Sequence, residues 1–155
     1  MIKILFVCHG NICRSPTAEF IMKDLVKKEY PEADIYIASS ATSTEEIGNP
    51  IYPPAKAELS RRGIPCGDKR AVQLKKSDYG KYDMFIVMDG NNMRNIIRIF
   101  GNDPDGKIHK LLDFTDRRGD ISDPWYSGRF DIAFDDIYSG CTGLLNYIRT
   151  KNKSL

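Results

Sequence analysis

Short apolar runs recur along the chain, and longer segments with a mixed pattern separate them. The first run, KILFV at residues 3–7, is continuously apolar rather than alternating, as expected for a strand that is covered on both faces. Runs of this kind predict strands over residues 3–7, 35–39, 82–88 and 107–112.

The segments between these runs carry apolar residues at helical spacing. Phe20, Ile21, Leu25 and Val26 follow this spacing in a segment that begins at a Ser-Pro-Thr cluster and stops at Tyr30-Pro31. The same pattern predicts further helices over residues 53–63, 91–101 and 130–151. Strands that alternate with helices predict an α/β fold, with a parallel sheet and helices on both of its faces.

Length and composition narrow the class of protein. With 155 residues, one domain spanning residues 1–155 is expected. Apolar residues make up 41% and charged residues 28%, which is typical of globular rather than disordered chains. The formal net charge of +2 is too small to indicate a nucleic-acid-binding surface.

Targeting and metal-binding patterns are absent from the sequence. No apolar run approaches the length of about 20 residues that a membrane helix needs, and no secretory signal is recognisable, so we expect a cytoplasmic protein without a membrane partner. The four cysteines form no Cys-x-x-Cys pair and the chain has only two histidines, which argues against a structural metal. We expect a monomer or weak self-association.

The segment VCHGNICRSPT at residues 7–17 joins the first predicted strand to the first predicted helix. Backbone N–H groups of such a turn, together with the start of the helix, form a binding site for an anion. Gly10 and Asn11 are residue types that tolerate the positive φ values this turn needs. Arg14 would hold two oxygens of a phosphate with its planar guanidinium. The predicted substrate-binding residues of this loop are His9, Gly10, Asn11, Ile12, Cys13 and Ser15.

A cysteine in such a loop is a candidate nucleophile. Free cysteine ionises with a pKa of about 8.5, and helix N-termini or basic neighbours lower this value to roughly 3.5–7.5. We therefore expect Cys8 to be a thiolate that attacks the bound phosphorus and forms a phosphocysteine. The alternative is a buried, unreactive core thiol, which Arg14 and the following helix start make the weaker interpretation.

The loop over residues 115–128 offers the acid that this reaction needs. Asp123 precedes Pro124 and two aromatic residues, Trp125 and Tyr126, which present faces for a flat substrate. Protonation of the leaving oxygen by a positioned acid typically contributes 10²–10⁴-fold. In the alternative interpretation Asp123 caps a turn or helix, and the two aromatic residues belong to the core.

Taken together, VCHGNICRSPTAE resembles the signature of the low-molecular-weight protein tyrosine phosphatases, and DPWY resembles their general-acid loop. The likeness continues through SSATSTEEIGNP, RRGIPC and YDMFIVMDGNNMR in the same order. The resemblance implies a flavodoxin-like, three-layer αβα fold with a four-stranded parallel sheet. It also implies cofactor-free hydrolysis of phosphotyrosine in a protein or of a small aryl phosphate.

The resemblance assigns roles to individual positions. It makes Cys8 the nucleophile, Arg14 the phosphate clamp and Asp123 the general acid. It also implies that the Ser15 hydroxyl bonds the thiolate and that Cys13 forms a reversible disulfide with Cys8, which protects against over-oxidation. Two further positions, Asn11 and Ser39, are expected to support the shape of the loop.

Two departures from the family pattern concern the mouth of the pocket and the support of the loop. Glu45 stands where the family often has an aromatic residue, which predicts a more open and more acidic mouth that disfavours acidic phosphopeptides. In the family a histidine belongs to the hydrogen-bond network of the loop asparagine, and in this chain Asp68 or Lys69 takes its place.

Two other functions are considered. An arsenate reductase needs shuttle cysteines, which Cys66 and Cys141 match poorly. The other alternative is a phosphoprotein-binding module without turnover.

Overall fold

The computed structural model describes residues 1–151 and contains a four-stranded, all-parallel sheet with the strand order β2-β1-β3-β4. The strands are β1 (Ile2–Cys8), β2 (Ile35–Ala41), β3 (Met84–Val87) and β4 (Ile108–Lys110). The helices are α1 (Arg14–Glu29), α2 (Pro53–Arg61), α3 (Gly90–Phe100), α4 (Pro124–Ser127) and α5 (Phe130–Lys151), with 3₁₀ turns η1 (Lys76–Gly80) and η2 (Leu111–Phe114). The α/β fold with a parallel sheet is confirmed; the last four residues of the expected 1–155 domain lie outside the described residues.

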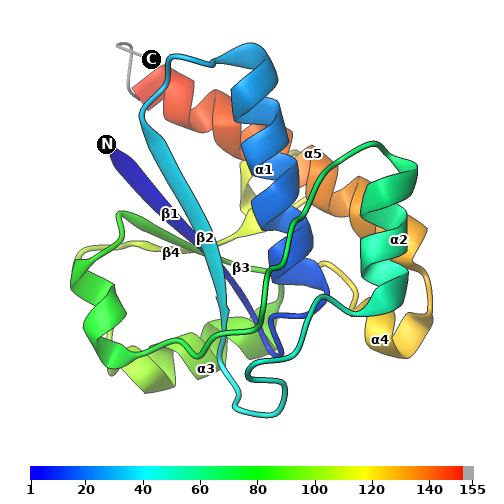
Figure 1. The fold of residues 1–155 in the computed structure, drawn as a ribbon. Helices are drawn as coiled ribbons and strands as arrows, with labels where there is room; N and C mark the ends of the chain where they lie inside the picture. Colours follow the sequence, from blue (N-terminus) through cyan, green and yellow to red (C-terminus); the bar gives the residue numbers. More distant parts are fainter. Residues whose placement is uncertain (152–155) are drawn as a thin grey trace.

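Helices cover both faces of the sheet, as Figure 1 shows. Ile4 and Phe6 of β1 point to one face, where they pack with residues of α1, α2 and α5. Leu5 and Val7 point to the other face and pack with Phe85 and with residues of α3. A strand buried on both sides has no polar face, which explains the continuous apolar run that the sequence shows.

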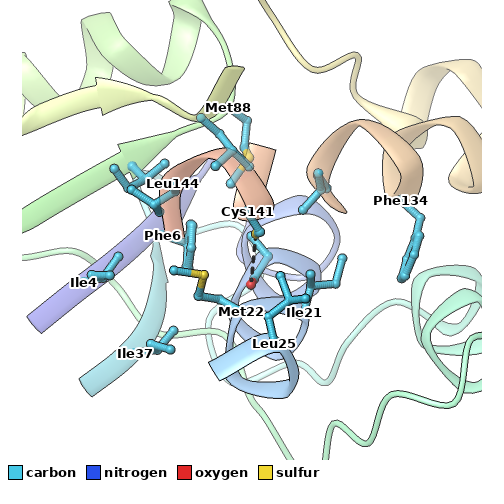
Figure 2. Close-up of a cluster of buried hydrophobic side chains, with 14 of the residues drawn as sticks. Ile4, Phe6, Ile21, Met22, Leu25, Ile37, Met88, Phe134, Cys141 and Leu144 are labelled. Atoms are coloured by element: carbon cyan, nitrogen blue, oxygen red, sulfur yellow. Dashed lines mark hydrogen bonds between the residues drawn. The ribbon is translucent and has the colours of Figure 1, made fainter. Parts of the chain in front are cut away.

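The larger cluster of buried side chains lies between the sheet and the helices α1 and α5 (Figure 2). Cys141 of α5 is fully buried there, and its sulfur lies 3.7 Å from the carbonyl oxygen of Ala18 in α1. Gly140, one residue earlier, permits a close approach, because a Cβ atom at this position would lie 2.4 Å from the side chain of Leu111. This contact joins α5 to η2.

The boundaries of some predicted elements differ in the structure. The strand predicted over residues 107–112 is limited to β4, because Leu111 and Leu112 turn into η2 and bury their side chains in the core. The strand predicted over 82–88 covers only 84–87. The short elements η1 and α4 were not predicted. Within residues 1–151, no helix combines the length and apolar character needed to cross a membrane.

All four strands run in the same direction and end at one edge of the sheet. Cys8, the last residue of β1, pairs with Ala41 of β2, and Val7 pairs with Val87 of β3. β1 lies between β2 and β3, so the connection from β1 to β2 runs to one side while β3 lies on the other side. This arrangement makes the carboxyl end of β1 a topological switch point. Loops that follow the strands here are expected to form the ligand site.

Candidate active site

A pocket of about 130 Å³ lies at this edge of the sheet. Its walls come from the anion loop (residues 8–14), from the loop after β2 and from the segment around α4. The lining residues are Cys8, His9, Gly10, Ile12, Cys13, Arg14, Glu45, Glu46, Asp123, Trp125 and Tyr126. The structure thus brings together residues that are more than a hundred positions apart in the sequence.

Cys8 lines this pocket, and the residue is 3% exposed. The backbone N–H groups of Asn11 and Ser15 donate to the Cys8 sulfur at 3.3 Å and 3.4 Å. The hydroxyl oxygen of Ser15 lies 3.0 Å from the same sulfur. Since N–H groups only donate, the sulfur serves as an acceptor, a role for which a thiolate is better suited than a thiol.

A hydrogen-bond chain fixes the direction of the Ser15 contact. The backbone N–H of Val72 donates to Asn11 Oδ1 at 3.1 Å, which sets the orientation of the Asn11 amide. Asn11 Nδ2 then donates to Ser15 Oγ at 2.7 Å and to Ser39 Oγ at 2.9 Å. Because Ser15 accepts from Asn11, its own hydroxyl proton is directed to the Cys8 sulfur. Side chains of Asn11, Ser15 and Ser39 therefore lie behind the pocket, not on its wall.

The two loop residues expected to have positive φ behave differently. Asn11 has φ of 58°, as predicted, and is 1% exposed. Gly10 is not among the positive-φ glycines, so the expectation for this residue is wrong. A Cβ atom at Gly10 would lie 3.4 Å from Glu46 Cγ. This is an ordinary van der Waals distance, so neither a left-handed turn nor a close approach requires glycine at this position.

Arg14 begins α1 and is almost fully buried. Its Nη1 donates to Asp89 Oδ2 at 2.7 Å and to the carbonyl oxygen of Ile121 at 2.8 Å. Its Nη2 lies 3.5 Å from Asp123 Oδ2. Burial alone lowers the pKa of Arg14, but the Cys8 sulfur and the two carboxylates outweigh this effect and raise the pKa above its usual value. The guanidinium is therefore a fixed positive charge beside Cys8.

Asp89, which follows β3 and caps α3, was not identified from the sequence. Its Oδ1 accepts from the N–H of Asn92 and its Oδ2 from Arg14.

The variant Asp89→Asn keeps a residue that caps helices well but removes the charge that orients Arg14. We expect kcat/KM to fall about ten- to a hundredfold, the worth of a hydrogen bond between charged groups. Steady-state kinetics and phosphate inhibition measure this loss, with the exposed Asp116→Asn as control. Unchanged kinetics in Asp89→Asn would contradict the role.

Asp123 has two contacts, and each corresponds to one of the two interpretations of the sequence, a helix cap and a group in the active site. It is the N-cap of α4, where its Oδ1 accepts from the N–H of Trp125 at 3.0 Å. Its Oδ2 faces Arg14 across the pocket. Capping therefore holds one carboxylate oxygen in place while the other lies at the site.

The two aromatic residues of α4 lie at the surface and not in the core. Trp125 is half-exposed and packs on Tyr52, with ring centroids 4.6 Å apart. Tyr126 is 86% exposed at the rim. Tyr52 was not predicted; its N–H donates to the carbonyl oxygen of Ile12, which ties the Trp125 wall to the anion loop.

Polar side chains from the anion loop and from the loop after β2 complete the lining of the pocket. His9 Nε2 and Glu45 Oε2 lie 3.0 Å apart, and both side chains are exposed. Glu46 also lines the pocket. Glu45 lines the pocket, whereas its place at the mouth and its effect on peptide preference stay predictions.

Cys13 lies on the pocket wall but is not activated like a nucleophile. Burial, and next the nearby Cys8, raise the pKa of Cys13 to about 12. A thiol with this pKa has a thiolate fraction of about 10⁻⁵ at pH 7.

We expect limited iodoacetamide at pH 7 to label Cys8 and to leave Cys13 unmodified, as measured by mass spectrometry of peptides. Equal labelling of both thiols would contradict the raised pKa of Cys13.

The Cys8–Cys13 disulfide stays a prediction, and all four cysteines are free in the structure.

The remaining cysteines do not contribute to the pocket. Cys66 and Cys141 are both buried in the core, and burial raises the pKa of Cys141. This position does not fit the shuttle thiols that an arsenate reductase needs. Over residues 1–151, no group of three or more His, Cys, Asp or Glu side chains is arranged to hold a metal ion.

Comparison with known proteins identifies the family. Residues 3–154 match the model of the low molecular weight phosphotyrosine protein phosphatase family. The chain therefore belongs to this family and is an enzyme of the protein-tyrosine-phosphatase class. The alternative of a binding module without turnover is thereby excluded.

Relatives match over nearly their full length. The low molecular weight protein-tyrosine-phosphatase YfkJ of Bacillus subtilis is 37% identical and both chains are covered completely. PtpA of Staphylococcus aureus is 34% identical over 96% of this chain and 94% of its own. The crystal structure of YfkJ superposes with a TM-score of 0.94, covering 98% of this chain and 97% of that one. The phosphatase SP-PTP from Streptococcus pyogenes gives a TM-score of 0.85 at 35% identity, covering 96% and 93%.

Proposed function

We propose that the chain hydrolyses phosphotyrosine and aryl phosphate monoesters through a phosphocysteine on Cys8, and that residues 1–155 act as one catalytic domain. The observation that carries the proposal is the set of three donors around the Cys8 sulfur, two backbone N–H groups and the Ser15 hydroxyl. Such donors stabilise a thiolate directly below the place where a phosphate would bind.

In the first step the Cys8 sulfur attacks phosphorus from the side opposite the leaving oxygen. A sulfur–phosphorus bond forms while the bond from phosphorus to the phenolic oxygen breaks. Asp123, in its protonated form, gives its proton to that oxygen, so that a neutral phenol leaves. Its position at the start of α4, facing Arg14, supports this assignment.

In the second step water replaces the sulfur on phosphorus. The Asp123 carboxylate removes a proton from the water, whose oxygen attacks the phosphocysteine. The sulfur–phosphorus bond breaks, inorganic phosphate leaves and Cys8 returns as a thiolate. The same side chain thus serves as acid and then as base.

Arg14 and the backbone amides carry the charge of the transition state. Contacts to Asp89 and Ile121 occupy Nη1. Nε and Nη2, of which Nη2 lies 3.5 Å from Asp123 Oδ2, are the nitrogens left to bind two phosphate oxygens, a bidentate arrangement that lysine does not offer. Backbone N–H groups of the anion loop would serve the remaining oxygens, as expected for a phosphoryl-transfer site.

The pocket walls favour an aromatic phosphoester. Trp125 supplies an aromatic face on the pocket wall, and the burial of Cys8 favours a phosphate that is carried on a long side chain such as phosphotyrosine. Phosphoserine is too short to place its phosphorus at the sulfur while its backbone stays outside. The acidic groups Glu45 and Glu46 at the mouth are expected to disfavour acidic phosphopeptides.

Turnover of matched peptides tests this proposal. With a chelator present, a phosphotyrosine peptide is expected to react about 100-fold faster than the same peptide with phosphoserine. Released phosphate is measured, and arsenate with a thiol serves as the control for reductase chemistry. Equal rates on both peptides, or thiol consumption with arsenate in place of phosphate release, would overturn the proposal.

A further inference from the structure

A second cavity, open to solvent and larger than the active-site pocket, lies between α2 and the segment that follows this helix. Its volume is about 540 Å³, against about 130 Å³ for the active-site pocket. Lys56 and Ser60 of α2 line one part of it, and residues 67–70 line another. Ile51 and nearby prolines add apolar surface. The steps proposed above use none of these residues.

The cavity carries two cations that are available to a ligand. Lys56 and Arg70 are both exposed, and among residues 1–151 neither forms an ion pair with a carboxylate. Lys69 also lines the cavity, but its Nζ donates to the carbonyl oxygen of Ser39 at 3.0 Å and lies 3.9 Å from Glu19 Oε1. The charge of Lys69 is therefore already compensated, and the cavity attracts anions through Lys56 and Arg70.

Hydrogen bonds hold one wall of the cavity in place. Pro50 and Arg70 form an antiparallel bridge, and the N–H of Ala71 donates to the carbonyl oxygen of Asn49 at 2.9 Å. Arg70 Nη1 donates to the carbonyl oxygen of Gly48 at 3.2 Å. This bond uses one of the five N–H donors of the guanidinium and restricts its side chain. A ligand that binds Arg70 thus orders it at a small further loss of entropy.

The two pockets are close to each other and differ in charge. Glu45 and Glu46 line the active-site pocket, and Pro50, further along the same loop, lines the second cavity. The chain from Glu46 to Pro50 spans at most about 14 Å even when fully extended, which limits the distance between the pockets. An extended peptide advances about 3.3 Å per residue, so roughly four to eight residues can join them.

We propose that the cavity between Lys56 and Arg70 binds an acidic segment of the phosphoprotein substrate, at a distance of several residues from the phosphotyrosine. The inference rests on the proposed function, because the segment belongs to the substrate of the active site. Cations on two separate elements favour a ligand that spans them, and the volume exceeds what one phosphate ion fills. Asp68 also lines the cavity, and its carboxylate weakens the attraction for an acidic ligand.

Matched phosphotyrosine peptides test this proposal. One peptide of each pair carries four glutamates about six residues before or after the phosphotyrosine, and the other carries four serines there. We expect wild type to have about fivefold lower KM for a glutamate peptide than for its serine partner, with the same kcat. Since the contacts are exposed, about 0.5 M salt is expected to abolish the difference.

Variants of the cavity assign the effect to its residues. Lys56→Gln/Arg70→Gln is expected to lose the preference for glutamate, and Asp68→Asn is expected to increase it. Lys27→Gln is the matched control, because Lys27 is an exposed lysine of α1 outside both pockets. Hydrolysis of p-nitrophenyl phosphate by the double variant is expected to stay within about twofold of wild type.

Binding of the unphosphorylated glutamate peptide locates the site without turnover. We expect the peptide to shift the backbone amide NMR signals of Lys56, Ser60 and residues 67–70. The proposal would be overturned by equal KM values in every pair, by a preference that persists in the double variant, or by shifts at these residues with inorganic phosphate but not with the peptide. A dimer in sedimentation that only the double variant abolishes would assign the cavity to a second copy of the chain instead. Failure of the proposed function differs, since wild type would then release no phosphate from any peptide.

Discussion

Cys8→Ser is expected to abolish phosphatase activity. Serine keeps the size and the hydrogen bonds of the side chain, but a hydroxyl does not ionise near neutral pH and is a far weaker nucleophile. We expect the turnover of p-nitrophenyl phosphate to fall by more than about 10⁴-fold. The fold and the affinity for phosphate are expected to persist, because Arg14 and the backbone N–H groups remain.

Cys66→Ser is the matched control for this experiment. Cys66 is buried like Cys8 but lies outside the pocket. Its replacement tests whether loss of any buried thiol lowers activity through stability, which thermal unfolding of both variants would show. Activity of Cys8→Ser near that of Cys66→Ser would exclude Cys8 as the nucleophile.

Asp123→Asn is expected to slow substrates according to their leaving groups. Asparagine still caps α4 but has no proton to give to the leaving oxygen. For phenyl phosphate, whose leaving group is poor, we expect kcat to fall by about 10²–10⁴-fold. For p-nitrophenyl phosphate the fall is expected to be much smaller, because its phenolate leaves without protonation. A plot of log kcat against leaving-group pKa would therefore become steeper.

Asp120→Asn supplies the control, since Asp120 belongs to the same loop and its partner is Lys110 on the surface. We expect it to leave the leaving-group dependence unchanged. Equal slowing of all aryl phosphates by Asp123→Asn would indicate a role in capping or in the position of Arg14. The general-acid assignment would then be wrong.

Strands and helices with one dominant periodicity were predictable from the sequence. The continuous run at residues 3–7 indicated a strand buried on both faces, and β1 packs on both faces. The predicted strand at 107–112 was too long because Leu111 and Leu112 are apolar for another reason, their burial in η2. Apolar residues report burial, but they do not distinguish a strand from a short turn.

The anion loop was predictable because its residues are contiguous. Cys8, Asn11 and Arg14 lie within one turn between a strand and a helix, and a parallel sheet places such turns at its ligand-binding edge. Gly10 shows the limit of this reasoning. A glycine in a turn suggests positive φ, whereas Gly10 does not have a positive φ in the structure.

Apart from Ser39, most residues that support the site from distant parts of the sequence were not identified. Asp89 was weakly indicated by the sequence, since it follows a predicted strand whose carboxyl end lies at the same edge of the sheet as the anion loop. No sequence pattern indicated a role for Tyr52 or Glu19, because only the packing of distant segments brings them to the loop. For Lys69 the sequence left Asp68 as an equal alternative, and the structure distinguishes them by the contact of Lys69 with Ser39.

The phosphorylated enzyme itself gives the most direct test of nucleophilic attack by Cys8. In Asp123→Asn the breakdown of the intermediate lacks its base, so it is expected to accumulate during turnover of p-nitrophenyl phosphate. Rapid quenching in denaturant, followed by mass spectrometry of peptides, locates the phosphoryl group. We expect one phosphoryl group on Cys8. Its location on another residue, or burst-free turnover without any phosphorylated protein, would contradict the mechanism.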